Sequence, residues 1–337
     1  MKEKMIMKEY GGCLNFEFQT KNINDYWDKY RNNKIDVDSG RSALQYIIEN
    51  YNINRIWLPV YNCPLVGKRI EKISKIDIIW YNIDSLFRPS IDLNDLHEGD
   101  AILWVNYCGV MPQTLIDEIA EWQKKTPAKV IIDNIPAYFS RPRMQVLNIY
   151  SCRKFIGVPD GGHIIGDSVK TKELPQYCIA ENYLYLLKAI ETGPNSAYSD
   201  YQESEKRFTE AQAAYGMPVL TKRILEGIDY REVIERRMKN FRVLHNILGI
   251  TNRLKLDDAT MTPSVYPYLS SSKSLREKLL ENKIYVSRFW KHVLTNELAN
   301  KFEKDLAEYL IPLPIDQRYD EQDMQYIANM VKKLEED

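Results

Sequence analysis

The chain has 337 residues, of which 44% are hydrophobic and 28% are charged, as in an ordinary soluble globular protein of about two domains. Its net charge of −1, the lack of an apolar run long enough to cross a membrane and the lack of a signal-peptide core at the N-terminus exclude nucleic-acid and membrane partners from our expectations. The five cysteines form no CxxC pair and no metal site is predicted, so we expect free thiols in the cytoplasm at positions 13, 63, 108, 152 and 178.

Helices and strands alternate from about residue 38 onward. The run Ala101–Val105 is apolar throughout, which is typical of a strand that is covered on both faces. Apolar spacing and turn residues predict further strands and helices in alternation. We expect strands at 55–58, 76–80, 101–105 and 129–133, and helices at 41–50, 64–73 and 113–125. This rhythm predicts an α/β domain with a mostly parallel sheet between helices.

The second half of the chain changes character. Residues 174–244 are expected to be largely helical, with an exposed polar loop at 192–205. A second, α+β unit begins near Arg253. Its expected elements are strands at 265–269 and 284–286, a helix at 273–281, and a segment at 308–315 that leads into a last helix at 321–333. We therefore divide the chain into a large domain (1–235, with an N-terminal extension) and a small C-terminal domain (236–337).

Asp133 ends the predicted strand 129–133. In open α/β sheets the carboxyl ends of the strands hold ligands, so an acid at this point is a candidate binding group. An acid that merely caps the turn after the strand is an equally reasonable interpretation.

Lys154 lies in a turn-rich, mostly uncharged segment that ends at Gly161-Gly162 and enters a strand at 162–165, which places it in a fixed loop near the sheet edge. A desolvated lysine loses its proton readily and can act as a nucleophile, although a lone lysine is more often a solvated surface residue. A lysine together with the strand-end acid Asp133 is what pyridoxal phosphate requires. One residue forms the Schiff base, and the other holds the proton of the ring nitrogen.

The segment Ser39–Leu44 begins a helix. Asp38 or Ser39 is expected to cap it. The same helix start exposes backbone N–H groups and a positive dipole end, which suit a phosphate.

Taken together, the chain resembles the DegT/StrS-type sugar aminotransferases, which are fold type I pyridoxal-phosphate enzymes. The resemblance runs from about residue 36 to 331 and rests on the order and spacing of several motifs. Those motifs are Ser39–Leu44, similar to SGTAAL; Val105–Gly109, similar to VHLYG; Asp133; Lys154 with its distance to Gly161-Gly162; Arg207–Gly216, similar to RMTDIQAALG; and Pro312–Ile315, similar to a late LPI strand.

The resemblance implies a large domain with a mostly parallel sheet and a small C-terminal α+β domain. It implies that Lys154 and Asp133 are the catalytic residues. The implied contacts to the cofactor are Ser39, Gly40, Arg41, Ser42, Tyr61, Cys63, Tyr107 and Ser151. It also implies a homodimer whose active sites are shared through Arg207–Gly216. The amino donor would be glutamate and the acceptor a keto group on a nucleotide-linked sugar, in cell-surface polysaccharide or related sugar biosynthesis.

The chain departs from the family at several positions. Pro136 replaces a Gln or His that contacts the cofactor, and Ile149 replaces a serine for which Ser151 is the expected substitute. Glu205 replaces a partner-chain Asn, and we expect it to point away from the phosphate because an acid would repel it. Cys63 stands near the usual stacking aromatic, so Tyr61 or Tyr107 would supply the ring unless both are core residues.

Three functions stay open. The first is an aminotransferase. The second is a pyridoxal-phosphate lyase or eliminase, although the family's dehydratases carry a histidine where this chain has Lys154. The third is a binding or regulatory protein on the same fold, favoured by Pro136 and Glu205. Four candidates are weaker: His163, Gln212 and His292 are expected to be packed or solvated, and Arg153 is either a phosphate contact or an exposed arginine.

Overall fold

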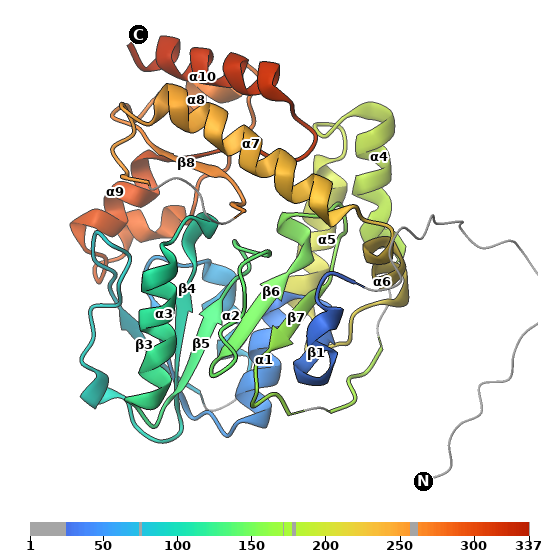
Figure 1. Ribbon diagram of the computed structural model, residues 1–337, viewed down its shortest axis with the longest axis vertical. Coiled ribbons are helices and arrows are strands. Elements are labelled where there is room, and N and C mark those ends of the chain that lie inside the picture. Colours follow the sequence, from blue (N-terminus) through green and yellow to red (C-terminus); the bar gives the residue numbers. More distant parts are fainter. Residues whose placement is uncertain (1–24, 74–75, 171, 177–179, 257–261, 337) are drawn as a thin grey trace, which may run out of the picture.

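The computed structural model describes residues 25–73, 76–170, 172–176, 180–256 and 262–336 (Figure 1). Its large domain contains a seven-stranded sheet in the order β1-β7-β6-β5-β4-β2-β3. The strands are β1 (Lys34–Val37), β2 (Arg55–Pro59), β3 (Asp77–Tyr81), β4 (Asp100–Val105), β5 (Lys129–Asp133), β6 (Leu147–Ser151) and β7 (Gly162–Ile165). Neighbours from β3 to β6 pair in parallel, whereas β7 runs antiparallel to both β6 and β1. The predicted α/β class with a mostly parallel sheet is confirmed.

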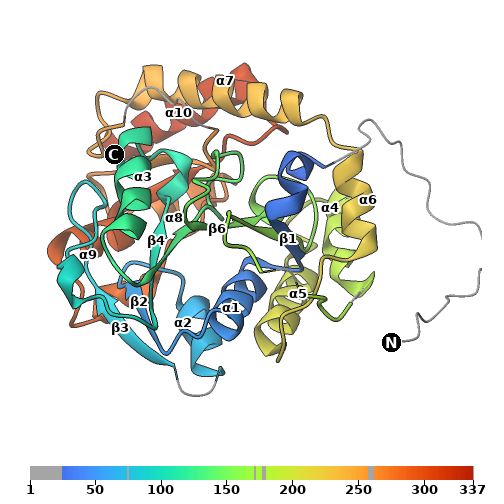
Figure 2. The same ribbon diagram turned by 60° about the horizontal axis from the view of Figure 1, so that its bottom comes forward.

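Helices cover both faces of this sheet, as Figure 2 shows. Side chains of a strand alternate between its two faces, so neighbouring residues of β4 join different cores. Ala101 and Leu103 pack in the cluster of α1 (Gly40–Asn50), whereas Ile102 and Trp104 pack in that of α3 (Gln113–Glu121). The apolar run of β4 therefore reflects burial on both sides.

The small domain packs its helices on a two-stranded antiparallel sheet of β8 (Tyr266–Leu269) and β9 (Leu310–Leu313). Its helices are α7 (Tyr230–Leu248), α8 (Leu275–Glu281), α9 (Lys301–Tyr309) and α10 (Glu321–Glu336). The boundary that we predict at 235/236 falls inside α7. The start of that helix packs with the large domain and its later part packs with the small-domain core. The division stays a prediction.

Three helices connect the domains: α4 (Leu184–Thr192), α5 (Tyr198–Glu210) and α6 (Val219–Glu226). The other described helix is α2 (Pro64–Glu71), and the 3-10 turns are Asp28–Asn33, Leu93–Asp95, Tyr107–Gly109, Trp122–Lys124, Cys152–Lys154, Ala180–Tyr183 and Lys291–Thr295. Within the described ranges, none of the helices combines the length and the apolar character of a membrane span. Cys13 and Cys178 lie outside the described residues.

Two expected elements are wrong. The polar run predicted as a loop at 192–205 is largely α5, because Ser204 and Phe208, one helical turn apart, are buried and anchor the helix. The strand predicted at 284–286 is absent. Ile284 and Val286 are buried in the small-domain core while Tyr285 is exposed, which gives a strand-like alternation to a segment outside the two-stranded sheet.

Three further expectations need correction. β1 and β6 were not predicted, and β6 places the lysine turn beyond an inner strand rather than at the sheet edge. The family-like helix at 207–216 ends at Glu210, so Gln212 lies outside it. The carbonyl groups of Ala211 and Ala213 accept hydrogen bonds from the buried Arg69 instead of continuing the helix.

Candidate functional site

A cavity of about 410 Å³ lies at the carboxyl ends of β4, β5 and β6, between the sheet and the small domain. This is the edge at which open α/β sheets bind ligands. The sheet side includes the ends of three strands, namely Val105, Asp133 and Ser151, and the small-domain side includes Pro267 and Trp290. Nine of the predicted site residues line it: Ser39, Gly40, Arg41, Tyr61, Cys63, Tyr107, Asp133, Ser151 and Lys154.

Lys154 ends the 3-10 turn that follows β6. The backbone of this turn is held from the small domain, because the Arg237 guanidinium donates to the carbonyl oxygens of Lys154 (3.4 Å) and Phe155 (3.3 Å). The Lys154 side chain has exposed surface, but the walls of the cavity that it borders are protein. This enclosure, together with the charge of Arg153, lowers the pKa of the amine. A larger neutral fraction makes it a better nucleophile.

Asp133 ends β5 and is only 5% exposed. Its Oδ1 accepts a hydrogen bond from the Ile135 N–H at 2.8 Å. Burial raises the pKa of the carboxyl group to about 7, although this hydrogen bond acts in the opposite direction. Among the described residues no cation pairs with Asp133. The Asp133 carboxyl group is therefore available to pair with a protonated, cationic atom of a ligand.

The start of α1 forms another wall of the cavity. Ser39 caps the helix, and its Oγ accepts from the Ser42 N–H at 3.2 Å. Ser42 lies outside the cavity lining, because its side chain turns inward to the Ser39 hydroxyl. A Cβ at position 40 would lie 2.2 Å from Ile135 Cδ1, so glycine allows the helix start to approach the loop after Asp133. The Gly40 and Arg41 region thus presents a helix N-terminus, which suits an anion.

Glu205 does not point away from this end, and that expectation is wrong. Its carboxylate accepts from Arg41 Nη2 at 3.5 Å and also forms a hydrogen-bonded ion pair with Arg153. All three residues line the cavity. Burial opposes the ionisation of Glu205, but the two guanidinium charges hold the pKa of its carboxyl below the ordinary value. α5 of this chain therefore contributes to the chain's own cavity.

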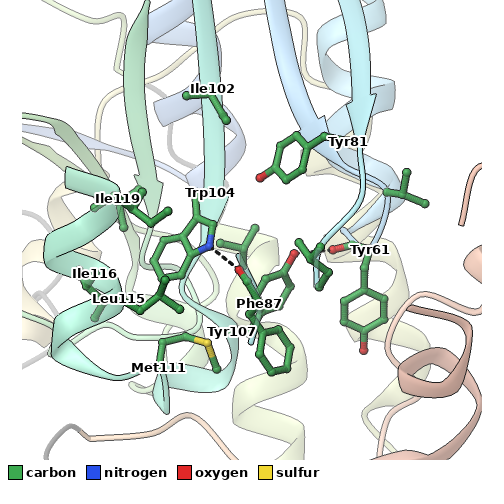
Figure 3. Close-up of a cluster of buried hydrophobic side chains, with 14 of the residues drawn as sticks. Tyr61, Tyr81, Phe87, Ile102, Trp104, Tyr107, Met111, Leu115, Ile116 and Ile119 are labelled. Carbon is green, nitrogen blue, oxygen red and sulfur yellow. Dashed lines mark hydrogen bonds between the residues drawn. The ribbon is translucent and has the colours of Figure 1, made fainter. Parts of the chain in front are cut away.

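Aromatic side chains form much of the remaining wall. Figure 3 shows Tyr61, Phe87 and Tyr107 gathered near Trp104, whose indole donates to the Phe87 carbonyl at 2.9 Å. The Tyr107 hydroxyl donates to the Tyr61 carbonyl at 2.9 Å, and the Trp290 ring lies edge-on to Tyr61 at 4.5 Å between centroids.

Sequence reasoning missed Phe87 and Trp290 as cavity residues. With Cys108 they have left-handed backbone, at φ of 62°, 58° and 56° in the order Phe87, Trp290, Cys108. Left-handed backbone is rare for such residues and concentrates at ligand sites. Neither local pattern nor spacing in the sequence signals it.

Three residues of the lining have buried polar atoms without a hydrogen-bond partner among the described residues: Tyr61 Oη, Asn62 Nδ2 and Arg153 Nε. Buried polar atoms in folded proteins are nearly always hydrogen-bonded. The other eight such atoms among the described residues lie outside the lining, so this feature by itself does not mark a ligand site.

Of the four weaker candidates, Arg153 lines the cavity and the other three lie elsewhere. His163 is fully buried, with Nδ1 2.8 Å from Asp36 Oδ1, and Lys34 pairs with the same acid at 2.9 Å. His292 and Gln212 are exposed and lie outside the cavity lining. Pro136 does line the cavity, but it contributes no donor.

No family model matches the chain, and no curated protein matches its sequence. Solved structures match its fold. A DegT/DnrJ/EryC1/StrS aminotransferase from Brucella abortus is 14% identical with a TM-score of 0.58, covering 91% of this chain and 88% of that one. The aminotransferase PseC of Helicobacter pylori, involved in pseudoaminic acid biosynthesis, is 15% identical with a TM-score of 0.61, covering 90% and 86%. Spr1654 from Streptococcus pneumoniae in its PLP form is 14% identical with a TM-score of 0.60, covering 92% and 89%. The chain therefore has the fold type I architecture that the resemblance implies.

Proposed function

We propose that the chain is a pyridoxal-phosphate-dependent aminotransferase of the DegT/StrS type that acts on a sugar. The observation that carries this proposal is one juxtaposition. Lys154, an amine of lowered pKa, and Asp133, an acid of raised pKa, border the same cavity at the carboxyl edge of the sheet. Groups with such perturbed pKa values in a cavity are typical of functional sites.

The residues present fit this cofactor. Lys154 would hold its aldehyde carbon, Asp133 its ring nitrogen, and the start of α1 with Arg41, Arg153 and Ser151 its phosphate. Our candidate for the ring that stacks on the cofactor, in place of Cys63, is Tyr61. Its carbonyl accepts a hydrogen bond from Tyr107, and its ring packs against Trp290.

When bound, pyridoxal phosphate supplies an exchangeable carbonyl and a ring that accepts electrons. Lys154 would hold this group covalently, and its Nζ, once freed, would take a proton from the substrate carbon and pass it to the cofactor carbon that the lysine had held. Asp133 keeps the proton on the ring nitrogen. The aromatic wall excludes water from the reacting atoms.

We further infer that the acceptor is a keto group on a nucleotide-linked sugar and that glutamate is the donor, in cytoplasmic biosynthesis of cell-surface polysaccharide or a related sugar. The fold shared with PseC supports a sugar substrate. Aromatic rings such as Trp290 suit the apolar faces of a sugar ring. A panel of keto-sugar nucleotides with labelled glutamate tests both assignments, and absence of labelled amino-sugar across the panel would argue for the lyase alternative.

A homodimer is part of the same proposal. On α4 three large apolar side chains are exposed, Leu184 at 45%, Leu187 at 53% and Ile190 at 80%, and α4 packs against the cavity-lining α5. Burying this face against a second copy would remove apolar surface from water. Light scattering should give twice the chain mass, and a strict monomer at micromolar concentration would contradict the dimer.

The cofactor assignment is tested at Lys154. The purified protein should be yellow, and borohydride should fix the cofactor to this residue. Lys154→Ala should lose the adduct and reduce turnover by several orders of magnitude, whereas the matched Lys124→Ala, at an exposed lysine, should change neither. A wild-type protein that stays colourless with added pyridoxal phosphate would refute the cofactor.

A binding or regulatory protein on this fold stays a second candidate, because Pro136 supplies no donor and Glu205 faces the anion end. If the cofactor binds but no amino donor converts it to the amine form, this candidate replaces the enzyme.

A further inference from the structure

We propose that Glu205 is a resident anion that competes with the phosphate of the cofactor for Arg41 and Arg153, and so sets how strongly this site prefers phosphorylated ligands. The proposal rests on the proposed function, because it assigns the phosphate of that cofactor to this end of the cavity. It makes Glu205 a specificity-determining residue.

The geometry places the carboxylate between the two guanidinium groups. Glu205 Oε2 lies 3.5 Å from Arg41 Nη2, and Oε1 is hydrogen-bonded to Arg153 Nη2. Both guanidinium groups also lie over the Phe208 ring, at 5.7 Å for Arg41 and 5.0 Å for Arg153. Their side chains are only 13% and 15% exposed. An anion that enters here meets two desolvated cations that already have a carboxylate partner.

Glu205 is held where it is. Its helix α5 is anchored by Phe208, which is 5% exposed, and by Thr209, whose Oγ1 accepts from Arg41 Nη1 at 3.2 Å. Lys72 Nζ donates to the Thr209 carbonyl at 2.7 Å, and Arg69 Nη2 donates to the Ala213 carbonyl at 2.8 Å. Because these contacts come from α1 and α2, the carboxylate stays near the anion site when a ligand arrives.

The charges give the sign of the effect. The two arginines and Glu205 together leave one net positive charge, whereas a phosphate monoester carries close to two negative charges at neutral pH. The guanidinium groups can still serve a phosphate, since each has five N–H donors and the bonds to Glu205 and Thr209 use only some of them. The carboxylate repels the phosphate while sharing its cations, so it weakens phosphate binding without abolishing it.

The test compares two ligands that differ only in the phosphate. Dissociation constants for pyridoxal phosphate and for pyridoxal are measured by absorbance titration of the full-length wild type, Glu205→Gln and Glu205→Asn. Glu205→Asp keeps the charge, and Glu203→Gln, at an exposed position of the same helix, is the matched control. Thermal unfolding of each variant confirms that it folds. The two neutral variants keep the test usable if one of them does not.

We expect the preference for pyridoxal phosphate over pyridoxal to rise by about tenfold or more in the neutral variants, because one repelling charge is removed at low effective dielectric. Glu205→Asp and Glu203→Gln should stay near wild type. A preference that is unchanged overturns the proposal, and so does a reduced one, which would mean that Glu205 only holds the arginines in place.

Failure of the proposed function would look different. If neither pyridoxal ligand forms an adduct with any variant, the cofactor assignment fails. The anion competition is then read from protection against thermal unfolding by inorganic phosphate, which should be larger in Glu205→Gln than in wild type. Equal protection in the two proteins would overturn the competition as well.

Discussion

At the scale of single residues, the site depends on two ionisable groups, enclosed Lys154 and buried Asp133, whose pKa values shift in opposite directions. Enclosure lowers the pKa of the Lys154 amine and raises that of the Asp133 carboxyl to about 7. Desolvation disfavours the charged form in both cases. Near neutral pH, the Lys154 amine is therefore a better nucleophile, and the Asp133 carboxyl group can bind a proton.

The raised pKa of Asp133 predicts that this residue lowers the free energy of unfolding by an amount that depends on pH. A buried acid whose folded pKa of about 7 exceeds its ordinary value destabilises the fold as pH rises from about 4 to 7, because the unfolded chain releases the proton earlier. Asp133→Asn should therefore stabilise the protein without added cofactor by on the order of 1 to 3 kcal/mol at pH 8 and by little at pH 4. Its Oδ1 can still accept from the Ile135 N–H.

Urea unfolding at the two pH values measures this difference. Asp167→Asn, at an exposed position, is the control and should show no such dependence. An equal effect of Asp133→Asn at both pH values would contradict the raised pKa. The same variant should lose most transamination, because an amide cannot hold the ring nitrogen's proton as a carboxylate does.

At the scale of elements, helix ends and their anchors shape the anion end of the cavity. α1 begins at Gly40 beside the loop after Asp133, and α5 ends where the carbonyls of Ala211 and Ala213 turn toward Arg69. Arg69 is 4% exposed, and burial lowers the pKa of its guanidinium. α2 thus fixes the end of α5, and with it the position of Glu205.

Arg69→Met should destabilise the protein by about 2 to 4 kcal/mol, since it leaves two carbonyl groups without their donor. It should also raise the preference for phosphorylated over plain pyridoxal, because α5 is released from α2 and no longer holds the repelling Glu205 carboxylate beside Arg41 and Arg153. Chemical denaturation and the absorbance titration check the two effects. The exposed Arg231→Met should cost about 0.5 kcal/mol or less, and a comparable cost for both variants would argue against the anchor.

At the scale of the whole molecule, α7 connects the small domain to the lysine turn through one buried arginine. Arg237 is 2% exposed and donates to the carbonyls of Lys154 and Phe155 on one side and to that of Ser264 on the other, at 3.1 Å. Its guanidinium also lies 4.6 Å from the Phe155 ring. Burial lowers its pKa to about 10. The position of Lys154 therefore depends on both domains.

Arg237→Lys should destabilise the protein by about 2 to 3 kcal/mol, because an ammonium cannot reach carbonyls on both sides as a guanidinium does. If the arginine positions Lys154, the rate of covalent attachment of pyridoxal phosphate should also fall. Stopped-flow absorbance measures that rate. Arg242→Lys, exposed on the same helix, should leave stability and rate unchanged. An unchanged attachment rate in Arg237→Lys would limit its role to stability.

The sequence alone determined the class of the fold and the pairing of a lysine with a strand-end acid. Apolar runs such as Ala101–Val105 follow from burial, which every fold must satisfy locally, so strands and helices could be read in order. The position of Asp133 at the end of its strand followed in the same way, whereas the strand β6 that leads into Lys154 was not predicted. The signals failed where a polar sequence hides a buried helix face, as in α5, and where a strand-like burial pattern has no pairing partner, as in segment 284–286.

Only the tertiary structure decided how the cavity is completed. Glu205 meets Arg41 across more than 160 positions of the chain, and Trp290 meets Tyr61 across more than 220. Such contacts depend on how distant elements pack, and the charge of a residue says nothing about which cation it will face. The sequence therefore placed the chemistry at the end of the sheet, whereas packing determined which side chains oppose it and which anion already lies there.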